Sequence, residues 1–277
     1  MLEPVFDITP EEIAPDQWMH CRLVLEINAC YLQYAVLQDK KLLRWTYYQL
    51  PPASPAEKLA MVEAVFKTAA ALHSSVKEKI LLYNFFEYCL LPEAFFDINL
   101  NRSFLNTMQG DLDTGPVISE KISGWPLYNL FRLPPGLGEL CRKELATASS
   151  GHHVSLWLAC LDKQQEGVHL LFSGDEMGVT LLREGKLHLV QSYPHQSHSD
   201  SIYHLLNLFT RFGLDREQTP VYLSGMVAPA SPLYQNMLKY FALLQPAALS
   251  PDFSISAAFR SVPDYFFSPL LKIAACV

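Results

Sequence analysis

The stretch that decides the fold of this chain is Leu23-Val24-Leu25, followed by Tyr34-Ala35-Val36-Leu37 and Leu42-Leu43-Arg44-Trp45. Small or polar pairs at 28–29 and 39–40 separate these apolar runs, which predicts three short strands joined by tight turns. Ser54-Pro55-Ala56-Glu57 then combines an N-cap, a proline at the first helical position and a capping-box glutamate. We therefore predict a helix that begins there, and a fourth strand at the apolar run 79–83.

The same order recurs between Val168 and Gly225. Adding 145 carries Leu37 onto Leu182, Lys41 onto Lys186, Leu42 onto Leu187 and Tyr48 onto Tyr193. Apolar residues recur at helical spacing in both copies, at Leu59, Val62, Phe66 and Ala69, and at Ile202, Leu205, Leu206, Phe209 and Phe212. Gly213 is placed to cap the second helix. A strand meander, a crossover helix and a parallel fourth strand predict two βββαβ halves with mixed sheets, an α/β fold.

The length of 277 residues suits two domains. We expect an N-terminal extension at 1–20, a first half at 21–148 and a second half at 149–277, with the boundary in the small and polar residues 147–151. Between the repeats, the pattern predicts a strand that ends at Pro92 and a helix with Phe95 and Phe96 facing inward. It also predicts a hairpin from 117–123 and 127–133, a helix at 136–146 and another at 154–162.

Composition excludes several classes of function. The net charge is −7 and there is no basic run, which argues against a nucleic-acid partner. No apolar run approaches the roughly 20 residues of a membrane span, and the acidic residues 1–17 do not resemble a signal peptide, so we expect a cytoplasmic protein. The six cysteines form no Cys-x-x-Cys pair and predict reduced core thiols. The sequence predicts no metal site; His152, His153, His188, His195, His198 and His204 are interpreted as loop, strand and cap residues.

The duplicated plan resembles the actin-like ATPase fold, a duplicated ribonuclease-H-like fold shared by actin, sugar kinases and heat-shock chaperones. Within it, the chain is similar to a family of uncharacterised bacterial proteins from about Arg22 onward. The residues that carry this likeness are 90–97 (Leu-Leu-Pro-Glu-Ala-Phe-Phe-Asp), Val221-Tyr222-Leu223-Ser224-Gly225 and Ser231-Pro232-Leu233-Tyr234. The resemblance implies ATP and magnesium as cofactors. The ATPases of this fold carry an Asp-x-Gly turn in each half, where the acid helps hold a hydrated metal ion and the glycine admits phosphate.

This sequence departs from that pattern in both halves. The first turn reads Glu26-Ile27-Asn28-Ala29, in which asparagine, a residue that tolerates a left-handed backbone, replaces glycine. In the second half Leu171 stands where the acid is expected and Ser173 where the glycine is, with Gly174 and Asp175 in the same turn. An Asp-Gly pair is also what an ordinary turn selects. The ATPases of this fold usually carry a pair of glycines after the strand that binds the adenosine part of the nucleotide. Here only one glycine, Gly225, stands at that place.

The resemblance therefore implies a nucleotide cleft formed by Glu26, Asn28, Ser173, Gly174, Asp175 and Gly225, with no catalytic residue assigned. Each lost charge-stabilising group costs roughly 100- to 1,000-fold in rate. The sequence favours a non-catalytic scaffold or interaction protein with a decayed nucleotide site, which binds a protein partner or itself. The alternative is a divergent ATP-binding protein, an ATPase or nucleotide-dependent switch. The candidate partner surface is the aromatic segment 262–267 (Val-Pro-Asp-Tyr-Phe-Phe).

Overall fold

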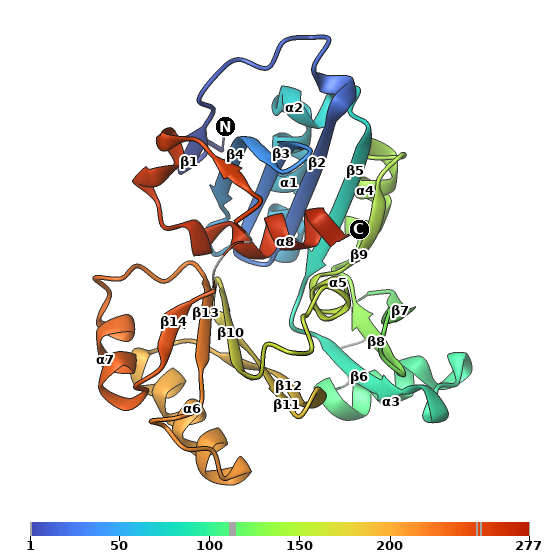
Figure 1. The fold of residues 1–277 in the computed structure, drawn as a ribbon. Helices are drawn as coiled ribbons and strands as arrows, with labels where there is room; N and C mark the ends of the chain where they lie inside the picture. Colours follow the sequence, from blue (N-terminus) through green and yellow to red (C-terminus); the bar gives the residue numbers. More distant parts are fainter. Residues whose placement is uncertain (1, 111–114, 248, 250, 277) are drawn as a thin grey trace. The chain divides into compact units, whose positions relative to one another are not determined.

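The computed structural model describes residues 2–110, 115–247, 249 and 251–276. The chain divides into two compact units, each described here by itself. Unit 1 comprises Met1–Cys160, Pro251–Phe259 and Lys272–Val277, and unit 2 comprises Leu161–Ser250 and Arg260–Leu271. The predicted boundary after Ala148 differs from this division, because β9 (Ser149–His152) pairs with the sheet of unit 1 and α5 (His153–Ala159) follows it in that unit. Figure 1 shows the elements in order along the chain.

The main sheet of unit 1 contains the predicted meander. Strands β2 (Cys21–Asn28), β3 (Tyr31–Gln38) and β4 (Lys41–Gln49) pair antiparallel in that order. After α1 (Pro55–Thr68) and α2 (Ala70–His73), the chain enters β5 (Glu78–Asn84), which pairs parallel with β2. On the far side of the meander, β1 (Phe6–Ile8) and β15 (Ser254–Ile255) pair with β4.

Local sequence explains why α1 forms where it does. The Ser54 side chain accepts a hydrogen bond from the Glu57 backbone N–H, and the Glu57 carboxylate accepts one from the Ser54 N–H, so the predicted capping box is confirmed. Val62, Phe66 and Ala69 of the predicted stripe are buried. The helix thus buries the face that its spacing predicts.

Unit 2 repeats the plan. The strand order is β12-β11-β10-β13-β14, with β10 and β13 parallel and β10, β11 and β12 an antiparallel meander. The bounds are β10 (Gly167–Ser173), β11 (Glu176–Arg183), β12 (Lys186–Pro194), α6 (His198–Phe212), β13 (Val221–Gly225), α7 (Pro232–Tyr240) and β14 (Leu244–Pro246). Ser197 caps the start of α6, and Gly213, in the left-handed region, ends it as predicted.

The two meanders correspond residue by residue. Adding 145 to the bounds of β3 and β4 gives the bounds of β11 and β12. The register shifts between Val36 and Leu37 in one unit and between Leu181 and Leu182 in the other, which is the same offset. Among the described residues other than glycine, only Asp39 and Glu184 have positive φ, and they too lie 145 apart. The constant offset seen in the sequence therefore extends to backbone geometry.

A small three-stranded sheet is inserted in unit 1 after β5. Its strands are β6 (Tyr88–Pro92), β7 (Val117–Lys121) and β8 (Leu127–Arg132), in the order β6-β8-β7, so the predicted hairpin is confirmed. Between β6 and β7 lie η2 (Glu93–Phe95), η3 (Ile98–Leu100) and α3 (Asn101–Gln109), and α4 (Leu137–Glu144) follows β8. Cys89, Leu105 and Leu130 form its core.

Two predictions about aromatic residues are wrong. Phe95 is 67% exposed, because it ends a short 3-10 turn in which neighbouring side chains diverge, while Phe96 stacks on Tyr128. The segment 262–267 is not an open partner surface: Tyr265, Phe266 and Phe267 are buried. The Tyr265 hydroxyl donates a hydrogen bond to the Val227 carbonyl at 2.7 Å. The segment contains η5 (Asp264–Phe266), which packs on β13.

The remaining elements are η1 (Trp18–His20), η4 (Ala257–Ser261) and α8 (Ser268–Cys276), and the division between the units passes through η4 and α8. All six cysteines are free thiols, with Cys21, Cys89 and Cys141 buried and Cys276 exposed. Within the described ranges, no helix has the length and apolar character needed to cross a membrane.

Candidate functional site

The first predicted site residue, Glu26, lies at the centre of a buried polar network in unit 1. Its side chain is 2% exposed. Oε1 accepts hydrogen bonds from the Asn84 amide at 2.6 Å and the Tyr31 hydroxyl at 3.1 Å, and Oε2 accepts one from the Gln33 amide at 2.5 Å. Nδ1 of His153 lies 2.9 Å from Oε1. The Glu26 carboxylate on β2 is therefore surrounded by partners from β3, β5 and α5.

A second layer of contacts holds these partners in place. The Trp45 indole N–H donates to Gln33 Oε1 at 2.9 Å, which fixes the Gln33 amide so that its nitrogen faces Glu26. The Asn84 amide also donates to the Tyr31 hydroxyl at 3.2 Å. Because Gln33, Asn84 and Tyr31 are themselves oriented by these contacts, the network holds the Glu26 carboxylate in one position.

The electrostatics favour an ionised Glu26. Burial alone would raise the pKa of Glu26, but the electrostatic attraction of the adjacent His153 and the hydrogen bonds from His153, Gln33 and Asn84 outweigh it and hold that pKa below its ordinary value. The side chain that does most to lower the pKa of Glu26 is thus an imidazole of the same unit. Nε2 of His153 is buried and has no hydrogen-bond partner in the described part of the chain.

The neighbouring His152 behaves differently. Its Nδ1 accepts a hydrogen bond from the Val154 N–H at 3.3 Å, so Nε2 carries the proton and donates to the Phe85 carbonyl at 2.8 Å. Complete burial lowers the pKa of His152 to about 3, which keeps the ring neutral. His152 is the N-cap residue of α5, which agrees with the cap interpretation, but both histidines are buried and neither is an exposed loop residue.

Sequence reasoning missed Tyr31, Gln33, Asn84 and His153 as members of this network. One signal was present: Glu26 and Gln33 are polar residues inside apolar strand runs, and the structure places them opposite each other in the β2–β3 register. A buried polar side chain requires a partner, so such interruptions indicate a network. The identity of His153 as the ion-pair partner had no local signal.

Asn28 serves the turn between β2 and β3. Its Oδ1 accepts a hydrogen bond from the Cys30 N–H at 2.8 Å, and its amide donates to the Asn84 carbonyl at 2.8 Å. Asn28 does not use the left-handed backbone that the sequence interpretation allowed it, because it is the last residue of β2. The side chain closes the turn as an Asx motif and is buried.

In unit 2 the predicted residues Ser173, Gly174 and Asp175 form the turn between β10 and β11. Gly174 has φ +60°, Ser173 is buried and Asp175 is exposed. The Asp175 carbonyl accepts a hydrogen bond from the His195 N–H at 2.6 Å. Burial, with the neighbouring Asp175 charge, raises the pKa of Glu176 to about 7.

Gly225 is required by the packing of two strands. Its φ is +90°, and a Cβ at this position would lie 2.1 Å from the carbonyl oxygen of Phe172 on β10. No side chain fits there without moving a backbone atom of the neighbouring strand. This glycine is thus explained by the sheet itself and needs no ligand to account for it.

The six predicted cleft residues are divided between the units. Glu26 and Asn28 lie at the end of β2 in unit 1, while Ser173, Gly174, Asp175 and Gly225 lie at the ends of β10 and β13 in unit 2. Their convergence on one nucleotide stays a prediction. Within the described ranges, no three His, Cys, Asp or Glu residues gather in a way that would hold a metal ion.

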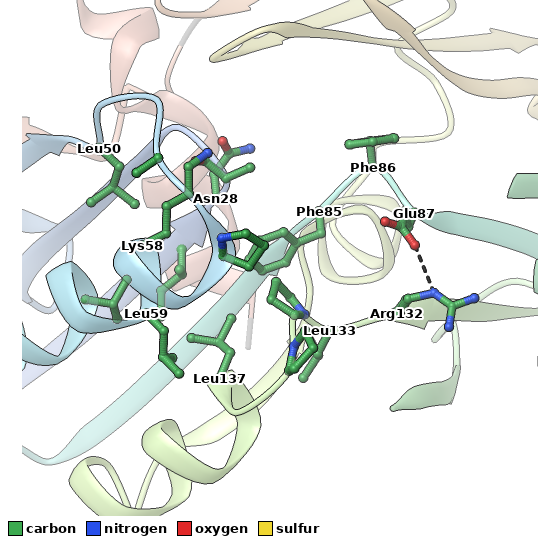
Figure 2. Close-up of a pocket in the computed structure, with 17 residues that line it drawn as sticks. Asn28, Leu50, Lys58, Leu59, Phe85, Phe86, Glu87, Arg132, Leu133 and Leu137 are labelled. Carbon is green, nitrogen blue, oxygen red and sulfur yellow. Dashed lines mark hydrogen bonds and ion pairs between the residues drawn. The ribbon is translucent and has the colours of Figure 1, made fainter. Parts of the chain in front are cut away.

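Unit 1 also contains a cavity of about 360 Å³ at the carboxyl ends of the parallel strands β2 and β5. Its lining is mostly apolar and comprises residues 27–29, Leu50, Ala53, Pro55, Lys58, Leu59, Val62, residues 85–87, residues 132–135 and Leu137. Lys58 donates to the Ala29 carbonyl at 2.8 Å. Figure 2 shows the Glu87–Arg132 ion pair, at 2.9 Å, to one side of the apolar side chains. The cavity has the size and character of a small apolar binding site.

Solved structures share this fold across nearly the whole chain. A Bacteroides thetaiotaomicron protein with actin-like ATPase fold and unknown function is 12% identical, with a TM-score of 0.74, over 94% of this chain and 99% of that one. The PilM–PilN type IV pilus biogenesis complex gives 11% identity and a TM-score of 0.53 over 92% and 96%. The ethanolamine utilization protein EutJ from Carboxydothermus hydrogenoformans gives 9% and 0.50 over 98% and 92%. The predicted actin-like ATPase fold is confirmed.

Comparison with curated proteins finds no match. A family described as "Protein of unknown function (DUF3822)" matches residues 10–244. That match spans most of the chain, including all strands of the two meanders. The chain therefore belongs to the DUF3822 family of proteins of unknown function.

Proposed function

We propose that this protein is a non-catalytic member of the actin-like fold, an interaction or scaffold protein whose nucleotide site has decayed. The observation that carries the proposal is the state of Glu26. In the ATPases that the sequence resembles, an acid at this position helps to hold a hydrated metal ion. Here the oxygens of that carboxylate already contact four side chains of the same unit.

Moving the Glu26 carboxylate to a metal ion would cost free energy. A hydrogen bond to a charged group contributes about 1.5–3 kcal/mol, and donors left buried without an acceptor cost a similar amount each. Glu26 would have to leave several such contacts to reach a metal ion. In the other half no acid stands at the corresponding strand position, which Leu171 occupies. Hydrolysis would then lack two charge-stabilising groups, each worth roughly 100- to 1,000-fold in rate.

The interaction part of the proposal is supported by surface chemistry. Five large apolar side chains of the inserted segment are exposed: Phe86, Phe95, Ile98, Leu100 and Met108. These side chains are close in sequence, and exposed apolar side chains that form a contiguous patch mark protein-binding surfaces. A similar fold occurs in the PilM–PilN complex, where the partner is another protein, and this analogy of fold supports the same class of role.

The repeated bounds, register shift and turn conformation support an origin of the two halves by internal duplication. We also propose that the protein is bacterial and cytoplasmic, as the sequence predicts.

Thermal unfolding with and without millimolar ATP and magnesium tests the proposal, alongside a phosphate-release assay. A ligand at 100 times its dissociation constant stabilises a protein by about 2.7 kcal/mol, which is a readily measured shift. We expect neither a shift nor phosphate release. A saturable shift accompanied by steady phosphate release would overturn the non-catalytic assignment.

Nucleotide binding without turnover is a second candidate, favoured by the Ser173-Gly174-Asp175 turn. Its left-handed glycine and exposed aspartate are compatible with a phosphate or a metal approaching the backbone. A thermal shift without phosphate release, lost in Asp175→Ala and retained in the control Asp215→Ala, would select this candidate. Asp215 is a loop acid of the same unit, far along the chain from the turn.

A further inference from the structure

The cavity of unit 1 has walls from four parts of that unit. They are the turn after β2, residues 50–62 around the start of α1, the link between β5 and β6, and the segment from the end of β8 into α4. Pro55, Pro134 and Pro135 lie in these walls. Because a proline ring fixes the φ angle of its residue, the backbone resists rearrangement at these positions. A cavity with such walls is preorganised, which lowers the free energy lost on binding a ligand.

The middle of the cavity is apolar. Leu133 and Leu137 line it and are 1% and 3% exposed, so they belong both to the cavity wall and to the packed interior. Figure 2 shows Phe85 and Leu133 between Lys58 on one side and Arg132 on the other. An apolar molecule in this space would leave water for a hydrocarbon surface, which favours its binding. The polar groups stand at the ends of that space.

Lys58 brings an unbalanced positive charge to the lining. Its ammonium donates to the Ala29 carbonyl at 2.8 Å, which uses one of three donors. No carboxylate within the described ranges pairs with it. Arg132, by contrast, pairs with Glu87 at 2.9 Å and donates to the Asn106 side chain at 2.7 Å. The charged lining residues are two cations and one acid, so the cavity has one surplus positive charge, at Lys58.

We propose that this cavity binds a small carboxylic acid with an apolar body. The carboxylate of the ligand pairs with the Lys58 ammonium, and the body lies against Phe85, Leu133 and Leu137. A carboxylate accepts the donors that Lys58 has left and supplies one negative charge, which equals the surplus of the lining. The volume of about 360 Å³ lies in the range of small-molecule sites, roughly 300–1,000 Å³.

The same lining is poorly matched to a nucleotide. A nucleoside triphosphate carries several negative charges and a polar ribose, and each of these groups needs a polar partner when it leaves water. One ammonium and a mostly apolar wall do not provide those partners. The inference therefore goes beyond the proposed function and does not rest on it, because it depends only on the cavity of unit 1. Phosphate release would overturn the non-catalytic assignment and leave the acid site intact.

A titration of the isotope-labelled full chain with sodium octanoate, followed by amide NMR, tests the site. We expect saturable shifts at residues 27–29, 58–62 and 85–87, which line or adjoin the cavity. Octan-1-ol, which has the same chain and no charge, should bind about tenfold more weakly, because it lacks the charge-assisted hydrogen bond to Lys58. Equal affinities would overturn the carboxylate assignment. The absence of saturable shifts with octanoate would overturn the site.

Lys58→Met removes the ammonium and keeps most of the apolar stem. This variant should bind octanoate no more tightly than octan-1-ol, while its affinity for octan-1-ol stays that of the wild type. Lys67→Met is the matched control, because Lys67 lies on the same helix, is 61% exposed and pairs with Glu63. It should keep the tenfold preference for the acid. A preference that persists in Lys58→Met would contradict the pairing with Lys58.

A second pair of variants tests where the apolar body lies. Leu59 lines the cavity, so the larger side chain of Leu59→Trp should occupy part of it and weaken octanoate and octan-1-ol by a similar factor. Ala60→Trp adds the same ring at an exposed neighbouring position outside the lining and should leave both affinities unchanged. Thermal unfolding verifies that both variants are folded. Wild-type affinities in folded Leu59→Trp would place the ligand elsewhere and overturn the proposal.

Discussion

His153 Nδ1 and Glu26 Oε1 lie 2.9 Å apart, and both side chains are almost fully buried. The pair joins the end of β2 to the first turn of α5, two segments that lie far apart in the sequence of unit 1. A buried carboxylate that is balanced within its own unit is a structural element. This contact fits the proposal that Glu26, at the position where the ATPases that the sequence resembles hold a metal ion, serves here to hold unit 1 together.

Glu26→Gln should destabilise the protein strongly. The substitution keeps the size of the side chain, but it removes the charge that balances His153 and replaces an acceptor oxygen with a donor nitrogen. Removing one partner of a buried ion pair costs about 3–5 kcal/mol. Urea unfolding followed by tryptophan fluorescence would measure the loss.

The matched control is Glu93→Gln, which breaks the exposed ion pair of Glu93 with Lys121. Exposed pairs contribute at most about 1 kcal/mol, so this variant should be close to wild type. If Glu26→Gln costs no more than Glu93→Gln, the network does not hold the unit together as described.

The buried neutral His152 should make the protein less stable in acid. Its pKa is lowered to about 3 in the folded protein, against roughly 6.5 when unfolded. The unfolded chain therefore takes up a proton below about pH 6.5 that the folded chain refuses down to about pH 3. Across this window the stability contributed by His152 falls as pH falls, by about 1.4 kcal/mol per pH unit.

The measurement is the free energy of unfolding of wild type and His152→Gln at pH 7, 6 and 5, where the glutamine amide can still donate to the Phe85 carbonyl. The difference between the two proteins isolates His152 from other titrating groups such as Glu176, whose raised pKa acts in the opposite direction. Parallel pH profiles for the two proteins would show that His152 is not buried in its neutral form.

Gly225→Ala should be far more damaging than a similar change at another left-handed glycine. At Gly225 the new Cβ would meet the Phe172 carbonyl oxygen at 2.1 Å, whereas nothing lies within 4 Å of a Cβ at Gly213. Both positions have positive φ, so both variants bear the backbone cost of about 1–2 kcal/mol. Only Gly225→Ala adds a steric cost of roughly 1–3 kcal/mol.

Thermal or urea unfolding of the two variants gives the comparison directly. Equal losses at Gly225 and Gly213 would mean that the approach of β13 to β10 is looser than the structure shows.

Much of the fold could be predicted from the sequence, because the meander, the crossover helix and their capping residues are local features. Ser54 and Glu57 cap α1 as expected, and the offset of 145 holds in strand bounds and turn conformation. Local patterns do not say which way a short segment turns its side chains. Phe95 is exposed for that reason, since a 3-10 turn replaced the predicted helix.

The candidate site was predicted only in part, because its members are distant in sequence. Glu26 and Asn28 were identified from the strand-end turn, yet the roles of their side chains depend on other strands. Asn84, which donates to Glu26, is 58 residues away. Hydrogen-bond partners across a sheet are set by register and packing, which only the folded chain defines.

The sequence by itself determined the two-fold repetition and the absence of the expected acid at Leu171, because periodicity and residue identity are written along the chain. The tertiary structure alone decided what the retained Glu26 does. Four side chains from β3, β5 and α5 satisfy its charge, because a buried carboxylate is stable only where polar partners converge on it.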